Sequence, residues 1–336
     1  MATVQIADIY NPLTFARREQ EAQLELNRFI NSGVLVSDAE LQNQIGAGGN
    51  IGELTNYNPL GTPEPNYSND NPAAKSTPNK VNSAKMSFRL TNQNQSWSTM
   101  DLSRELALED PVSAITGRIG QYWATINERR LIRSALGILA DNIANDGGDM
   151  RFSVATDTAG AVTDSERISA NTVLTAKQTM GDHAGSLSAI AMHSAIHTRL
   201  QRQGSILDHF DPETGRLLYS TYLGYTVLVD DVLPAVAGTN RITYTCILFG
   251  MGAWGWANGK VLVPSEKDRI PDAGNGGGQD VIHSRRSDLI HPMGFSFTSA
   301  SVAGQSATLA ELQTASNWNR VWARKHIPMA FIQVND

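Results

Sequence analysis

The fold is decided near the middle of the chain, where residues 109–148 read EDPVSAITGRIGQYWATINERRLIRSALGILADNIANDGG. Asp110 is a suitable helix N-cap, and Pro111 follows at the first helical position, where its missing N–H leaves no hydrogen bond unmade. Apolar residues then recur at spacings of three and four, which is the pattern of one helix face. Gly147 and Gly148 can adopt the left-handed conformation that closes a helix. We therefore predict one uninterrupted helix over residues 110–145.

The length of this helix bears on the architecture. About 35 residues at a rise of about 1.5 Å each give a rod of roughly 50 Å. Such a rod is about three times the mean helix length of globular proteins, which is too long for one layer of a compact enzyme core. We predict that the helix is the spine of an elongated body.

The composition excludes several classes of protein. The chain has 336 residues, of which 41% are hydrophobic, so it can build a sizeable core. Its net charge of −6 argues against a dedicated nucleic-acid reader, which would carry a basic excess. The single cysteine, Cys246, excludes an internal disulfide framework. We see no signal-peptide pattern and no apolar run of membrane-spanning length, and we expect a soluble cytoplasmic product.

A first helix is predicted over residues 11–33, with Asn11 as its N-cap and Gly33 at its end. Phe15 and Phe29 belong to its thin apolar stripe. A terminal helix with so little apolar surface is not stable alone, so we expect it to lie against another surface, such as a neighbouring chain.

The segment that follows, up to the spine helix, is mostly polar. It is dense in Asn, Gly, Thr and Ser, and five of the 13 prolines fall between Pro59 and Pro78. Within it, residues 85–91 (KMSFRLT) alternate in polarity as a strand does. Met86, Phe88 and Leu90 are its apolar positions. We predict an extended two-stranded arm that pairs with another subunit, because an isolated hairpin is marginal in water. The alternative is a disordered surface loop.

The remainder divides into two parts. Helical and strand-like runs alternate after the spine helix and indicate one α+β domain over residues 163–279, with a flexible glycine-rich tip at residues 275–278. Strands predicted at 280–290, 295–299 and 327–334 then return to the spine helix as a second, elongated body. A capping box at Thr308–Glu311 indicates a short helix between these strands.

Three patterns resemble functional sites. Residues 250–255 (GMGAWG) match G-x-G-x-x-G, but a strand follows instead of the helix that a dinucleotide needs, so we interpret them as a bend. His193 and His197 have the spacing of two zinc ligands, yet Ser194 stands where the catalytic glutamate would be. Cys246 lies in an apolar strand, where a thiol is buried and unreactive. An enzyme that depends on a metal or a nucleotide is therefore the weaker hypothesis.

A small basic cluster lies on the spine helix. Arg129, Arg130 and Arg133 form it, with Glu128 beside them. Such a cluster has three alternative interpretations: non-specific contacts with phosphate, a solvated helix face, or ion pairs between subunits.

Several stretches taken together resemble a known family. These are YLGYTVLVDDVLP at 222–234, TCILFGMGA at 245–253, LIHPMGFS at 289–296, NW at 317–318 and KHIP at 325–328. Their order and spacing across the C-terminal two thirds are similar to those of major capsid proteins of tailed bacteriophages. These proteins have the Hong Kong 97-type capsid fold, which encapsulin shells share.

The resemblance implies an α+β capsid-type fold with four parts. Residues 1–45 would be an N-terminal arm and residues 46–100 an extended loop that lies over a neighbour. Residues 101–162 and 280–336 would form a peripheral domain that holds the spine helix. Residues 163–279 would form an axial domain whose glycine-rich tip faces the centre of the capsomer.

The function implied is structural. The subunit would assemble by shape, without catalysis, metal or cofactor, into hexamers and pentamers of an icosahedral head in the host bacterial cytoplasm. The head would enclose double-stranded DNA, contacted non-specifically, and further partners would be decoration, scaffolding and portal proteins, with no membrane. An encapsulin-like compartment is the first alternative. The residues expected at subunit contacts are Phe15, Phe29, Met86, Phe88, Leu90, Arg129, Arg130 and Arg133.

Overall fold

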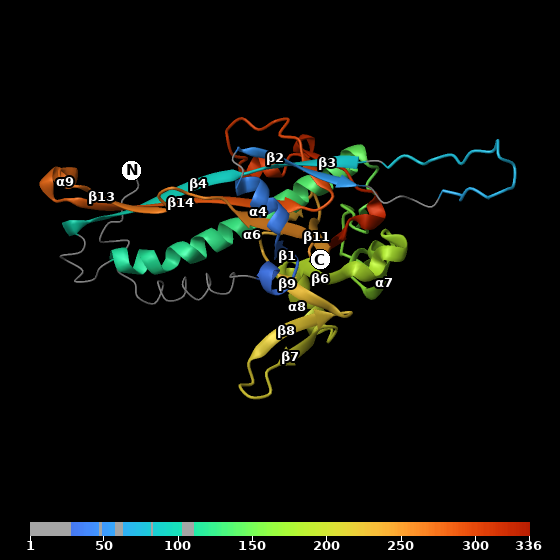
Figure 1. Cartoon of the computed structure of the whole chain (residues 1–336). Helices are drawn as coiled ribbons and strands as arrows, with labels where there is room; N and C mark the ends of the chain where they lie inside the picture. Colours follow the sequence, from blue (N-terminus) through green and yellow to red (C-terminus); the bar gives the residue numbers. More distant parts are fainter. Residues whose placement is uncertain (1–27, 47–48, 58–62, 82, 103–110) are drawn as a thin grey trace.

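The computed structural model describes residues 28–46, 49–57, 63–81, 83–102 and 111–336 (Figure 1). One long helix, α6, runs beside a long narrow sheet, and a second sheet lies below the middle of the molecule. Two segments project from this body in different directions: the loop between β2 and β3, and the β7–β8 hairpin.

The spine helix forms as predicted. Helix α6 spans Pro111–Asn145, which is 35 residues, while the expected N-cap Asp110 lies outside the described residues. Gly147 and Gly148 have φ angles of 68° and 72°, and the N–H of Gly148 donates to the carbonyl of Asn142 at 2.9 Å. This is the closure that two glycines permit at a helix C-terminus.

The long narrow sheet has five strands. Its central strand is β14 (Gln279–Pro292), which pairs with β4 (Thr91–Met100) along one side and with β13 (Ser265–Ile270) and β12 (Trp254–Asn258) along the other. Strand β1 (Leu35–Ser37) adds a parallel edge next to β12. The sequence placed residues 91–100 in the extended loop, but they belong to this sheet, because their partners lie almost 200 residues away and local composition cannot reveal them.

The second sheet has eight strands. Seven follow the order β5 (Arg151–Ser153), β17 (Met329–Asn335), β11 (Ile242–Gly250), β6 (Leu187–Met192), β9 (Tyr225–Val229), β8 (Leu217–Tyr222) and β7 (Leu207–Phe210), and β10 (Ala235–Ala237) pairs with β11. Side chains on β11 alternate between two cores. Ile247 and Phe249 pack with residues of α6, whereas Cys246 and Leu248 pack with the helices on the other face. Because both faces are covered there, residues 246–249 of the strand are all apolar and buried.

Two helices cover that other face, α7 (Ala170–Gln178) and α8 (Ser194–Arg202). The shorter elements are 3-10 turns at Asp164–Glu166, Gly181–Ser186, Ala315–Asn317 and Arg324–His326, and the helices α3 (Arg28–Asn31), α4 (Ala39–Gly46), α9 (Ala273–Gly276) and α10 (Leu309–Leu312). The capping box at Thr308–Glu311 is present as predicted. Strand β15 (Phe295–Phe297) pairs with β16 (Trp318–Arg320) beside α10.

The two sheets cut across the domain boundaries expected from the sequence. Strand β17 was assigned to the elongated body, yet it lies in the eight-stranded sheet between β5 and β11. The glycine-rich tip is α9, which ends the β13–β14 hairpin at one extreme of the five-stranded sheet, far from the β7–β8 hairpin (Figure 1). Residues 217–229 form two paired strands that are joined by a turn at Leu223 and Gly224. Pairing between segments far apart in the chain decides the placement of β17.

The two-stranded arm is present, and its base packs on its own chain. Strands β2 (Ile51–Tyr57) and β3 (Ser83–Arg89) are antiparallel, and the described residues between them, 63–81, are exposed and without helix or strand. Met86 and Phe88 are buried with Leu54 against the body. Gly52 leaves room for the Phe88 ring, which a side chain there would overlap.

Gly137 sets how closely α6 approaches the C-terminal part of the chain. A Cβ at this position would overlap the Leu312 carbonyl oxygen, and that oxygen already accepts a hydrogen bond of 2.7 Å from Nε1 of Trp318. We expect Gly137→Ala to lower the free energy of unfolding by about 2 kcal/mol, because crowding outweighs the gain in helix propensity. Gly120→Ala in the same helix meets nothing within 4 Å and should raise it by up to about 1 kcal/mol. Chemical denaturation of the unassembled subunit tests both, and shifts in the same direction would contradict this packing.

His291 makes the stability of the fold depend on pH. It is fully buried in β14, its Nε2 lies 2.9 Å from the Phe295 carbonyl oxygen, and burial lowers its pKa to about 4. The folded chain therefore keeps the ring neutral while the unfolded chain takes up a proton below its ordinary pKa of 6.5.

The resulting stability is full above pH 6.5 and falls by about 3 kcal/mol as the pH drops towards 4. We expect His291→Gln, which keeps a donor for Phe295, to remove this part of the acid sensitivity. Denaturation curves at pH 7 and pH 4.5 measure it. Equal losses of stability in the wild type and the variant would show that the ring is not held neutral.

Candidate functional site

The histidine pair serves local structure. Nδ1 of His193 accepts the Ala195 N–H at 3.1 Å as the N-cap of α8, and its Nε2 lies 3.6 Å from the Asp231 carboxylate. Burial lowers the pKa of His197. Within the described ranges, no three His, Cys, Asp or Glu side chains are grouped so that they could hold a metal ion.

The glycine-rich motif and the cysteine also have structural roles. Gly250 ends β11, and β12 begins at Trp254, so a bend between strands stands where a dinucleotide site needs a helix. A Cβ on Gly250 would lie 2.6 Å from Cβ of Pro328, so close packing explains this glycine. Burial raises the pKa of the Cys246 thiol to about 12, which leaves it protonated and unreactive.

The arginine cluster mainly braces the spine helix. Arg130 is buried and donates to the Ala307 carbonyl at 2.9 Å and to the Thr91 hydroxyl at 2.6 Å, and burial lowers its pKa to about 10. Arg133 donates to the side chain of Gln313. Arg129 alone is exposed. The predicted role of these three residues in subunit contacts stays a prediction, and Arg129 is the member that remains accessible for it.

The apolar residues expected at subunit contacts lie mostly inside the chain. Phe29 packs edge-to-face on Phe249 with ring centroids 5.8 Å apart, and Met86 and Phe88 are buried. Leu90 is partly buried against the cluster that contains Met86 and Phe88. Phe15 lies outside the described residues. These side chains are held by their own subunit, and their contact with a neighbour stays a prediction.

Large apolar surface is uncovered elsewhere, on the β7–β8 hairpin. Every residue of β7 is exposed, as are the first three of β8. Its exposed large side chains are Leu207, Phe210, Leu217, Leu218 and Tyr219. Local sequence does not indicate this surface, since apolar residues in a strand normally belong to a core. Residues 211–215 (DPETG) have the composition of a turn, which is the local sign of a hairpin here.

A cleft of about 410 Å³ opens beside the root of this hairpin. The segment leading into α7 forms one wall, the end of α8 forms another, and Tyr222 and Leu223 from the β8–β9 turn close it. Two guanidinium groups line it. Arg167 pairs with Asp164 at 2.9 Å, and Arg199 pairs with Asp336 at 2.6 Å, so both charges have partners within the chain.

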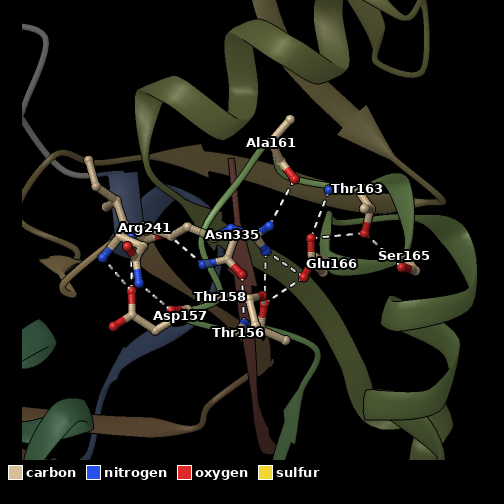
Figure 2. Close-up of polar contacts among 11 residues, drawn as sticks. Thr156, Asp157, Thr158, Ala161, Thr163, Ser165, Glu166, Arg241 and Asn335 are labelled. Carbon is tan, nitrogen blue, oxygen red and sulfur yellow. Dashed lines mark hydrogen bonds and ion pairs between the residues drawn. The ribbon is translucent and has the colours of Figure 1, made fainter.

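A polar network fixes the segment that leads to the cleft (Figure 2). Glu166 accepts hydrogen bonds from the Thr156 hydroxyl, the Thr163 N–H and Arg241, and these lower its pKa to about 2. Asp157 accepts the backbone N–H groups of three successive residues, 239–241. Loop 154–166 is thereby tied to the β10–β11 turn, so contacts within the chain hold this wall of the cleft in place.

The helices give no sign of a membrane segment: none in the described part of the chain is both long and apolar enough to cross a bilayer.

Comparison with known proteins gives a family. The model of the Gp13-like family, described as major capsid protein 13-like, matches residues 103–327. The major capsid protein of Bacillus phage SPP1 is 30% identical in a match that covers 97% of this chain and 97% of that protein. The family is one of phage coat proteins and not of encapsulins, which decides between the two shell hypotheses.

Solved structures agree on the fold. The capsid protein of cyanophage Pam1 matches with a TM-score of 0.53 at 10% identity, covering 88% of this chain and 87% of that one. The capsid protein of Ralstonia phage GP4 matches with a TM-score of 0.52 at 11% identity, covering 86% and 84%. At these identities the likeness concerns the fold alone, and it confirms the capsid-type α+β architecture. By its family match, its full-length relative and its fold, the chain belongs to the Gp13-like major capsid proteins of bacteriophages.

Proposed function

We propose that this coat subunit builds the icosahedral head as hexamers and pentamers and encloses double-stranded DNA. The observation that carries the proposal is the match to a phage major capsid protein along the whole chain. The net charge of −6 fits DNA that is confined rather than tightly bound, since tight binding requires a basic surface. Assembly takes place in the cytoplasm of the host, by shape and without catalysis.

In this proposal the two sheets belong to different domains of the coat subunit. The five-stranded sheet and α6 form the peripheral domain, including β12 and β13, and the eight-stranded sheet forms the axial domain, including β5 and β17. Residues 51–89 act as the extended loop and residues 1–45 as the arm. Residues 63–81 are all exposed, which supports a role that begins on assembly.

The experiment is electron microscopy and light scattering of the protein expressed alone. We expect closed shells, tubes or capsomers, all far heavier than one chain of 36.4 kDa. A variant with residues 63–81 replaced by a short Gly-Ser linker is the matched control. It should fold, since β2 and β3 keep their pairing, but should not form closed shells. A monodisperse wild-type monomer or dimer whose residues 63–81 resist protease would overturn the proposal.

A further inference from the structure

The chain contains two Asn-Gly pairs, Asn258-Gly259 and Asn275-Gly276. The glycine of such a pair has no side chain to shield its backbone nitrogen, so this nitrogen can approach the amide carbon of the preceding asparagine. Both asparagines are exposed to solvent. Exposure therefore does not distinguish the two pairs, and the hold on the backbone at each pair decides whether the approach takes place.

The backbone of the first pair is held in the five-stranded sheet. Asn258 ends β12, opposite Asp288 of β14. Its N–H donates to Oε1 of Gln42 at 3.0 Å, and its carbonyl oxygen accepts from Nε2 of Gln42 at 2.7 Å. The N–H of Gly259 donates to the Ser287 carbonyl at 2.7 Å. The attacking nitrogen is thus occupied, and the peptide cannot rotate unless this end of the sheet opens.

The second pair lies in α9, at the tip of the β13–β14 hairpin (Figure 1). No residue of α9 is buried. Asn275 has φ and ψ angles of 57° and 44°, and Gly276 has a φ of 88°. The Gly276 N–H donates to the Asp272 carbonyl at 3.3 Å, which is longer than most hydrogen bonds of this kind. Glycines stand on both sides of Asn275, so the peptide rotates here at little cost.

From this contrast we propose that Asn275 is a site of spontaneous deamidation in the folded chain. The backbone nitrogen of Gly276 loses its proton and attacks Cγ of Asn275. A nitrogen–carbon bond forms, the bond from Cγ to the side-chain nitrogen breaks, and ammonia leaves with the proton. Water then opens the resulting succinimide, at one carbonyl to give aspartate and at the other to give isoaspartate. The reaction consumes no oxidant or reductant.

The modification changes the charge at one end of the molecule. Each event adds one negative charge to a chain whose net charge is already −6, close in the chain to the carboxylate of Asp272. The isoaspartate product also inserts a methylene group into the backbone of the tip. This inference goes beyond the proposed function and does not depend on it, because the reaction needs the chain and water alone.

The test is to age the purified full-length chain at neutral and at mildly alkaline pH. Mass spectrometry of peptides, prepared by digestion in mild acid, gives the fraction of acid at each Asn-Gly pair, and isoaspartate is measured separately. We expect Asn275 to convert at least about tenfold faster than Asn258, because opening the sheet adds about 1.4 kcal/mol or more to the barrier at Asn258. Conversion should be faster at the higher pH, since the attacking nitrogen must lose its proton.

The same measurement in guanidinium chloride is the control for the fold. In the unfolded chain both pairs have a flexible backbone, so the two rates should become similar. Asn275→Gln is the control for the chemistry, because its longer side chain must close a larger ring, and it should keep its amide. A native chain in which Asn258 converts as fast as Asn275 would overturn the proposal. So would an Asn275 that stays an amide for as long as the unfolded chain needs to convert.

Asn275→Asp reproduces one of the two products. The melting temperature of the unassembled subunit should stay unchanged in this variant, because no residue of α9 is buried. Its isoelectric point should fall to that of the aged wild-type species, which isoelectric focusing resolves. A large loss of stability in Asn275→Asp would overturn the proposal that a folded chain carries this modification.

Discussion

The structure depends on one helix that is buried against two sheets at once. Towards its N-terminal half, α6 meets the five-stranded sheet, where Nε1 of Trp123 donates to the Ser284 hydroxyl at 2.9 Å. Towards its C-terminal half, residues such as Ile132 and Leu139 share a core with Phe331 of the eight-stranded sheet. Since most helical stability in proteins comes from packing, the long helix and the two sheets hold one another in place.

This arrangement leaves the assembly elements at the periphery. The core absorbs most of the apolar residues expected at contacts, including Phe29 and Phe88, and gives Arg130 internal partners. The loop at 63–81 and the β7–β8 hairpin keep exposed side chains on projecting elements, which the proposed assembly can use. A coat subunit needs this division, because it must fold alone and yet keep surface that is satisfied only by neighbours.

Polar and strained features support the same division. The network of Thr156, Glu166 and Arg241 fixes a loop that has little apolar surface of its own, so the wall of the cleft does not rely on a partner. Leu223 accepts an unfavourable backbone conformation at the mouth of that cleft. A subunit shaped in advance loses less conformational entropy when it joins a ring.

Features that depend on near neighbours in the chain can be predicted from the amino-acid sequence. The spine helix, the capping box at Thr308–Glu311 and the buried strand that holds Cys246 follow from periodicity and capping chemistry, and the ordered motifs indicated the family. Three other features became visible in the folded chain alone: β17 joins the eight-stranded sheet, β4 lies along β14, and the large apolar side chains of β7 are exposed. Strand partners and burial depend on segments that lie far away in the chain, so local sequence patterns do not predict them.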